Sequence, residues 1–209
     1  MRIIDISMEI SEDMPVYPGN PHPSIEKYRQ IPEDSTTESK ICIGSHTGTH
    51  VDALQHVKED GETVKQIDLE NFYGDCQVLD LTRCDENVER ADLEEKEIKT
   101  GIVLLKTENS LKPYQRFRKD FTYLTLDAAE YLADQNVRTV GIDYLSLVKF
   151  DGGRKAEEAH LKANERMTVI EGLDLSKAEP GRYVFSGMPL KIAADGAPMR
   201  AVLIDREQE

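Results

Sequence analysis

The stretch "TLDAAEYLADQNVRTVGID", residues 125–143, decides the fold class. Its first part predicts a helix over 125–137, because Thr125 is a favourable N-cap and the apolar residues that follow recur at helical spacing. The next segment, "RTVGID" (138–143), predicts a strand, and the apolar run "GIVLLKT" (101–107) predicts another. Strand, helix and strand in this order form a βαβ unit, so we predict a parallel sheet and an α/β fold.

The segments around this unit add further strands. "RIIDISM" (2–8), "SKICIGS" (39–45) and "DCQVLDLT" (75–82) have the apolar patterns of strands. The C-terminal stretch 182–205 predicts two or three strands joined by Gly/Pro turns, which favours antiparallel hairpins. Since no repeat or linker divides the chain, we expect residues 1–209 to form a single domain with a parallel and an antiparallel portion.

Composition limits the classes of partner and compartment. The 209 residues are 39% hydrophobic and 32% charged, with a formal net charge of −14. An acidic surface repels phosphate groups, so neither nucleic acid nor an anionic membrane is an expected partner. No run approaches the roughly 20 apolar residues of a spanning helix, and the N-terminus lacks the features of a signal peptide. We therefore expect a cytoplasmic protein.

The cysteines do not suggest a disulfide framework. Cys42, Cys76 and Cys84 are odd in number and lack C-x-x-C spacing, which is typical of reduced thiols. We expect each to be a small buried apolar residue.

The most unusual segment is "SHTGTHVDALQH" (45–56), which holds three of the five histidines. The segment does not favour a helix, because threonine, glycine and valine, all poor helix formers, separate the polar residues. In an extended chain the even-numbered residues share one face, and His50 and Asp52 lie about 7 Å apart, a suitable span for two ligands of one ion. His46 would lie about 13 Å from His50 in a straight strand. We therefore predict a bend at Gly48, the residue best able to form one.

Imidazole and carboxylate groups at this spacing predict a divalent metal site, because packing them together without an ion would be costly. His56 lies a further four residues beyond Asp52, about 13 Å along a strand. We expect it beside the metal as a general acid/base rather than on it. His160 lies on a predicted helix over 156–163, and takes part only if the fold brings it to the cluster. His22 is expected to be solvated in a loop.

The segment "HTGTHVDALQH" closely resembles the H-x-G-T-H-x-D-x-P-x-H signature of the cyclase family of metal-dependent hydrolases, which includes bacterial kynurenine formamidases and isatin hydrolases. The segments "MPVYPGNP" (14–21), "GIDYLSL" (141–147), 160–171 and "GAPMRAVLI" (196–204) occur in the family's order. The resemblance implies a swivelling β/β/α three-layer fold, with a mainly parallel sheet, an antiparallel sheet and a helical layer. It also implies a homodimer.

The resemblance further implies roles for individual residues. His46, His50 and Asp52 would bind a first metal ion, and Asp52 would bridge to a second ion held by His160 and Glu171. The implied cofactor is one or two divalent ions per subunit, most often zinc, with manganese as the alternative. His56 corresponds to the catalytic histidine of the family.

The resemblance implies hydrolysis of an amide, with N-formylkynurenine converted to kynurenine and formate in tryptophan catabolism. Two alternatives stay open: hydrolysis of a cyclic amide such as isatin, and metal-dependent binding without turnover. The sequence departs from the signature at Leu54, where the family has proline, and it contains no Trp to hold an aryl ring. Tyr17 occupies a position where the family commonly has an aromatic residue, so it is a candidate for binding the substrate.

Overall fold

The computed structural model of the protein describes residues 1–112 and 116–205. The helices are short, and most strands contain six residues or fewer. In chain order the elements are β1 (Arg2–Asp5), β2 (Ser24–Arg29), β3 (Glu38–Cys42), β4 (His50–Asp52), η1 (Leu54–His56), η2 (Val64–Gln66), η3 (Leu69–Phe72), β5 (Tyr73–Leu81), β6 (Asn87–Val88), α1 (Arg90–Glu94), β7 (Ile102–Thr107), η4 (Glu108–Leu111), β8 (Tyr123–Leu124), α2 (Leu126–Asp134), β9 (Thr139–Ile142), α3 (Gly153–Arg166), β10 (Thr168–Glu171), β11 (Gly181–Ser186), β12 (Gly196–Pro198) and β13 (Val202–Asp205).

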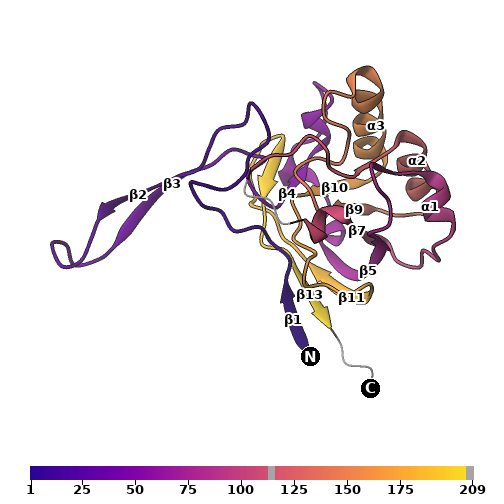
Figure 1. The fold of residues 1–209 in the computed structure, drawn as a ribbon. Helices are drawn as coiled ribbons and strands as arrows, with labels where there is room; N and C mark the ends of the chain where they lie inside the picture. The colour runs from indigo at the N-terminus through magenta and orange to yellow at the C-terminus, as the bar shows by residue number, and fades with distance from the viewer. Residues whose placement is uncertain (113–115, 206–209) are drawn as a thin grey trace.

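Within the described residues, nine strands form one sheet in the order β1-β13-β11-β5-β7-β9-β10-β4-β12 (Figure 1). The four strands β5, β7, β9 and β10 are parallel, and antiparallel strands continue the sheet at both ends. The predicted βαβ unit is confirmed, because β7 and β9 are adjacent and parallel with α2 between them in the chain. The α/β fold with a parallel and an antiparallel portion is therefore confirmed.

The C-terminal strands are antiparallel, as predicted, but they are not consecutive hairpins. β11 pairs with β13 and β5, whereas β12 pairs with β4 at the opposite end of the sheet. The expectation of consecutive hairpins was wrong because β12, which lies between β11 and β13 in the chain, leaves both strands and pairs with β4. This long return of the chain brings residues 193–198 to the histidine segment.

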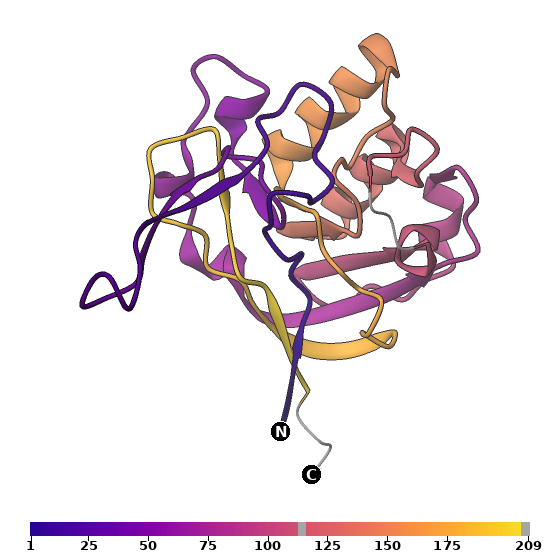
Figure 2. The same ribbon diagram turned by 60° about the vertical axis from the view of Figure 1, so that its left-hand side comes forward.

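The central strands are buried on both faces, which explains their continuous apolar sequence. On β7, Ile102 and Leu104 belong to one apolar cluster, whereas Val103 and Leu105 belong to another. The second cluster includes buried residues of α1, α2 and α3, so the helices form a layer over that face (Figure 2). No helix among the described residues is long and apolar enough to cross a membrane.

Strands β2 and β3 pair only with each other and project from the body as a two-stranded arm (Figure 1). The strand predicted over 39–45 is present as β3, but the expectation that Cys42 is buried was wrong. Cys42 is exposed because no second layer packs on the arm. Cys76 is buried and Cys84 is half-buried, and neither forms a disulfide.

Candidate metal centre

Strand β4 places His50 and Asp52 on the same face of the sheet. Side chains alternate along a strand, so Val51 points into the apolar cluster on the opposite face, while its two neighbours point toward the helical layer. Both polar residues are almost completely buried, with 1% of each exposed. The predicted proximity of His50 and Asp52 is confirmed, because His50 Nε2 lies 3.3 Å from Asp52 Oδ1.

The chain bends before β4, as the sequence predicted. Gly48 has a φ of +64°, in the left-handed region that favours glycine. The carbonyl of Gly48 packs against Gly172, where a Cβ atom would lie 2.3 Å from the carbonyl oxygen. This bend returns His46 to the cluster, with its Nδ1 atom 2.9 Å from Asp52 Oδ1.

The chain also turns immediately after β4, which the sequence did not predict. We expected the chain to continue as an extended strand from Asp52 to His56, but β4 ends at Asp52 and residues 54–56 form the 3₁₀ turn η1. The turn brings the ring of His56 to within 4.1 Å of the His46 ring, between centroids. The ligand atoms of Asp52 and His56 lie within 4.8 Å of each other, so their expected separation of about 13 Å was wrong, because a turn shortens the path along the chain.

His160 and Glu171 reach the same place from two other elements. Glu171 ends β10 directly opposite His50 of β4, so both side chains lie on the helical side of the sheet. His160 projects from α3, and its Nε2 atom lies 3.0 Å from Asp52 Oδ2 and 4.0 Å from Glu171 Oε1. The fold thus brings together all five residues that the resemblance proposed as metal ligands.

The donor atoms fit a divalent cation. His50 Nδ1 faces the carbonyl oxygen of Gly48 at 2.8 Å, so this nitrogen carries the proton and Nε2 has a free lone pair. Nε2 is buried without a hydrogen-bond partner, 3.6 Å from Glu171 Oε2. A buried unpaired acceptor is costly, and a cation held also by Asp52 would satisfy it. The ligand atoms of His50, Asp52 and Glu171 all lie within 4.8 Å of one another, as do those of His46, Asp52 and His56.

The pKa values of the two carboxylates in the cluster are shifted in opposite directions. Burial raises the pKa of Asp52, but hydrogen bonds from His160 and His46 outweigh it and hold this pKa well below the usual range. Burial and the charge of Asp52 raise the pKa of Glu171 to about 7. Without a metal, Glu171 is therefore partly protonated near pH 7 whereas Asp52 stays ionised, and a bound cation would take over the role of the proton on Glu171.

The pKa values of the histidines are also shifted in different directions. Burial disfavours the charged form of His46, but Asp52 and Asp195 outweigh this and raise its pKa to about 9. Burial also opposes protonation of His160, whose pKa is nevertheless raised by Asp52. Burial lowers the pKa of His56, and the neighbouring histidines lower it further. His56 is therefore neutral near pH 7, and with a third of its side chain exposed it can exchange a proton with a ligand.

Sequence reasoning missed Asp195, which lies in the turn before β12. Its Oδ2 atom lies 2.8 Å from His46 Nε2 and 3.6 Å from His56 Nδ1. The "ADGAP" sequence looks like an ordinary turn, and the only signal was that it adjoins a segment already matched to the family. His22 is exposed, as expected.

Tyr17 lies in an aromatic group rather than alone. Its ring centroid is 5.2 Å from Phe117 and 5.6 Å from Phe150, in edge-to-face geometry. Burial raises the pKa of Tyr17, and so does the negative charge of Glu171.

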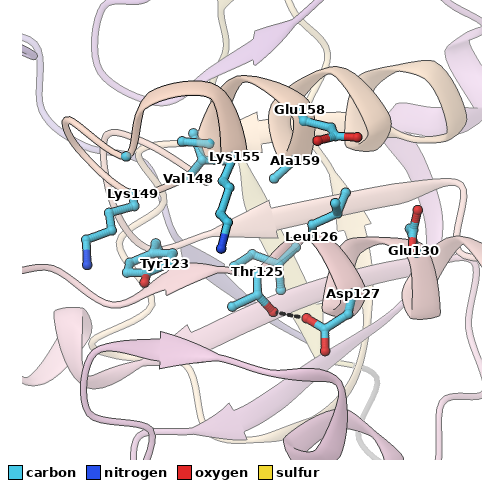
Figure 3. Close-up of a pocket in the computed structure, with 13 residues that line it drawn as sticks. Tyr123, Thr125, Leu126, Asp127, Glu130, Val148, Lys149, Lys155, Glu158 and Ala159 are labelled. Carbon is cyan, nitrogen blue, oxygen red and sulfur yellow. Dashed lines mark hydrogen bonds between the residues drawn. The ribbon is translucent and has the colours of Figure 1, made fainter.

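A separate hollow of about 610 Å³ lies between α2 and α3 (Figure 3). Lys149, Lys155 and Tyr123 line it together with Asp127 and Glu130. None of the residues proposed from the resemblance lines this hollow. Its charges are of both signs, so it does not select a class of ligand.

The chain resembles known proteins over nearly its whole length. The model of the family described as "Putative cyclase" matches residues 4–148. The chain belongs to the cyclase family. One relative, a kynurenine formamidase of Sphingopyxis alaskensis, is 33% identical over 207 residues. The aligned residues cover 97% of this chain and 97% of the relative.

Solved structures of other proteins share the fold. A potential metal-dependent hydrolase with cyclase activity superimposes with a TM-score of 0.84, at 36% identity over 99% of both chains. Isatin hydrolase A from Labrenzia aggregata also gives a TM-score of 0.84, at 21% identity over 98% of this chain and 94% of its own. The latter likeness concerns the fold alone.

Proposed function

We propose that the protein is a metal-dependent amide hydrolase of the arylformamidase type, converting N-formylkynurenine and water to kynurenine and formate. The observation that carries this proposal is the buried, unpaired Nε2 atom of His50, which faces the carboxylates of Asp52 and Glu171. Membership of the cyclase family and the full-length relatives named kynurenine formamidase support the reaction class.

His46, His50 and Asp52 would hold a first ion, and Asp52, His160 and Glu171 a second. The imidazole and carboxylate donors suit zinc, and manganese is the alternative. A divalent cation in such a site activates water and polarises a carbonyl oxygen. One or two ions per subunit are compatible with this ligand set, because Asp52 offers one oxygen toward His46 and the other toward His160.

His56 would deliver the proton that the leaving nitrogen needs. Its ring adjoins the proposed ligands on two sides, at 4.1 Å from His46 and 5.3 Å from His160, between ring centroids. Its lowered pKa keeps it neutral near pH 7, so it can accept a proton from water and pass it on. His56 is also close enough to His46 and Asp52 to act as a ligand, which makes the metal content of a His56 variant informative.

Tyr17 would form one wall for the aryl ring of the substrate. Together with Phe117 and Phe150 it supplies aromatic surface in a chain that lacks Trp. Rings of this kind hold an aryl group by edge-to-face contact.

A panel assay tests the substrate class. Protein loaded with zinc and, separately, with manganese is given N-formylkynurenine, isatin and a small aliphatic formamide. The proposal predicts formate release with N-formylkynurenine as the preferred substrate. Preference for isatin would identify a cyclic-amide hydrolase, and metal uptake without any product would identify a binding protein.

We also propose a homodimer. The two-stranded arm supports this, because it exposes Ile25 and Ile41, which are direct cross-strand partners. A two-stranded ribbon is marginally stable by itself, and exposed apolar residues on it mark an interaction surface. A second copy of the chain is the partner that the family leads us to expect.

A further inference from the structure

Asp195 contacts two histidines of the centre but lies outside the signature segment. Its carboxylate is 2.8 Å from His46 Nε2 and 3.6 Å from His56 Nδ1, both measured from Oδ2. We propose that Asp195 is a positioning residue that fixes the ring orientation of both histidines, one a proposed ligand and the other the proposed proton carrier. The role of Asp195 toward His56 rests on the proposed function, whereas the effect of Asp195 on His46 does not.

The backbone holds Asp195 in place from both sides. The carbonyl oxygen of Asp195 accepts a hydrogen bond from the backbone N–H of Ala53 at 2.9 Å, and that of Ala194 accepts one from Val64 at 3.0 Å. Immediately afterwards β12 pairs with β4, with Gly196 opposite Asp52. The turn is therefore anchored to the same strand that carries the proposed ligands.

Gly196 lets the turn approach the His46 ring. A Cβ atom at this position would lie 2.7 Å from His46 Cε1, closer than van der Waals contact allows. A residue with a side chain would push the ring or the turn away. The close approach shows that the contact between Asp195 and His46 is part of the local packing, not a chance meeting of surface groups.

The chemistry of the contact is that of a carboxylate behind a ligand histidine. His46 presents Nδ1 toward Asp52 and Nε2 toward Asp195. With Nε2–H donating to Asp195, the lone pair of Nδ1 is directed to the proposed ion, and the carboxylate increases the basicity of the ring. Removal of such an outer carboxylate typically weakens metal binding by about 10- to 100-fold.

The same carboxylate determines the tautomer of His56. Because Nδ1 is the ring nitrogen on the side of Asp195, a negative charge there favours the proton on Nδ1 and leaves the Nε2 lone pair free. The free Nε2 lone pair is the one that a proton carrier requires. One side chain thus orients two rings whose centroids are 4.1 Å apart.

The experiment compares Asp195→Ala and Asp195→Asn with a matched control, Asp5→Asn. Asp5 is also a partly exposed carboxylate of the sheet, but it pairs with Arg200. Zinc affinity is measured by competition with a chromophoric chelator, thermal unfolding checks the fold, and kcat and KM are measured with N-formylkynurenine. Asp195→Asn keeps an oxygen that can accept from His46 Nε2–H but removes the charge.

We expect Asp195→Ala to weaken zinc binding by about 10- to 100-fold. We expect Asp195→Asn to bind zinc more tightly than Asp195→Ala, yet to lower kcat by about tenfold with KM unchanged, since the tautomer of His56 is no longer fixed. Asp5→Asn should match the wild type in affinity and kcat. Zinc affinity of Asp195→Ala equal to that of the wild type would overturn the inference. If the wild type releases no formate, the proposed function fails, whereas zinc affinity still decides the role of Asp195 behind His46.

Discussion

At the residue scale, Leu54 is the one visible departure from the family signature, and the structure explains why it is tolerated. Leu54 is the first residue of η1, where proline is favourable because it breaks no hydrogen bond within the turn. The preceding Ala53 has φ −87° and ψ 160°, the extended conformation that proline requires before it. The signature proline therefore rigidifies the turn that carries His56, and leucine adopts the same conformation without it.

Leu54→Pro should raise the free energy of unfolding by about 0.4–1 kcal/mol, because proline restricts the unfolded chain. Urea unfolding measures the change. Gln55→Pro is the matched control and should destabilise the protein, since the backbone N–H of Gln55 donates to the carbonyl of Glu62. A loss of more than about 1 kcal/mol in Leu54→Pro would show that Leu54 has a packing role that outweighs the gain.

The raised pKa of His46 predicts how the metal-free protein responds to pH. Because its folded-state pKa of about 9 exceeds the ordinary value of 6.5, its contribution to stability is complete below pH 6.5 and is lost as the pH rises through 9. The melting temperature of chelator-treated protein should therefore fall between pH 6.5 and 9. His46→Asn should flatten this decline, and an equal decline in variant and wild type would contradict the assignment.

At the element scale, the sequence predicted regular structure better than turns. The helix over 125–137 and the strands of the βαβ unit appear as α2, β7 and β9, because their apolar patterns fix the type of element. The helix ends at Asp134, three residues earlier than predicted, and Asn136 beyond it has a φ of +61°. The bend at Gly48 was predictable from the required reach of His46. The turn η1 and the pairing of β12 with β4 were not, because neither leaves a periodic pattern and the pairing joins residues far apart in the chain.

The same limit explains which site residues were found. His46, His50 and Asp52 are close in sequence, so spacing alone suggested a shared ion. His160 and Glu171 required the family resemblance, since only the folded chain brings α3 and β10 to β4. Asp195 was missed altogether, because a single carboxylate in a turn has no distinctive sequence pattern.

Asp143, which follows β9, ties together the ends of the parallel strands. Its carboxylate accepts hydrogen bonds from the backbone N–H and hydroxyl groups of both Thr107 and Ser110. Burial raises the pKa of Asp143, although these hydrogen bonds act in the opposite direction. Its role in this structure is to satisfy buried donors where β7 ends.

Asp143→Ala should lower the free energy of unfolding by about 3 kcal/mol, because it leaves buried N–H groups without an acceptor. Asp143→Asn keeps one acceptor oxygen and should cost less. Urea unfolding of both variants measures the difference. A change below about 0.5 kcal/mol in the alanine variant would mean that water replaces the carboxylate at these donors.

At the scale of the whole molecule, the arm of β2 and β3 is the feature that the body of the protein leaves uncovered (Figures 1 and 2). Ile25 is 39% exposed and Ile41 is 61% exposed, on adjacent strands. We predict that the wild-type protein has about twice the mass of the 23.7 kDa chain in solution. Sedimentation equilibrium measures this mass.

The double variant Ile25→Glu, Ile41→Glu should dissociate into single chains, because burying the new charges would be costly. Lys40→Ala, an exposed position on the same arm, should leave the assembly unchanged. A double variant that keeps the assembled mass would place the interface elsewhere on the molecule.

The most direct test of the central claim measures bound zinc and formate release together, in the wild type and in His56→Ala. The wild type should release formate from N-formylkynurenine in proportion to its bound zinc. His56→Ala should keep nearly all of its zinc while its turnover falls by about 100-fold or more, because the proton carrier is lost and the ligands remain. No formate release from fully loaded wild-type protein would contradict the account, and parallel loss of zinc and turnover in the variant would make His56 a ligand instead.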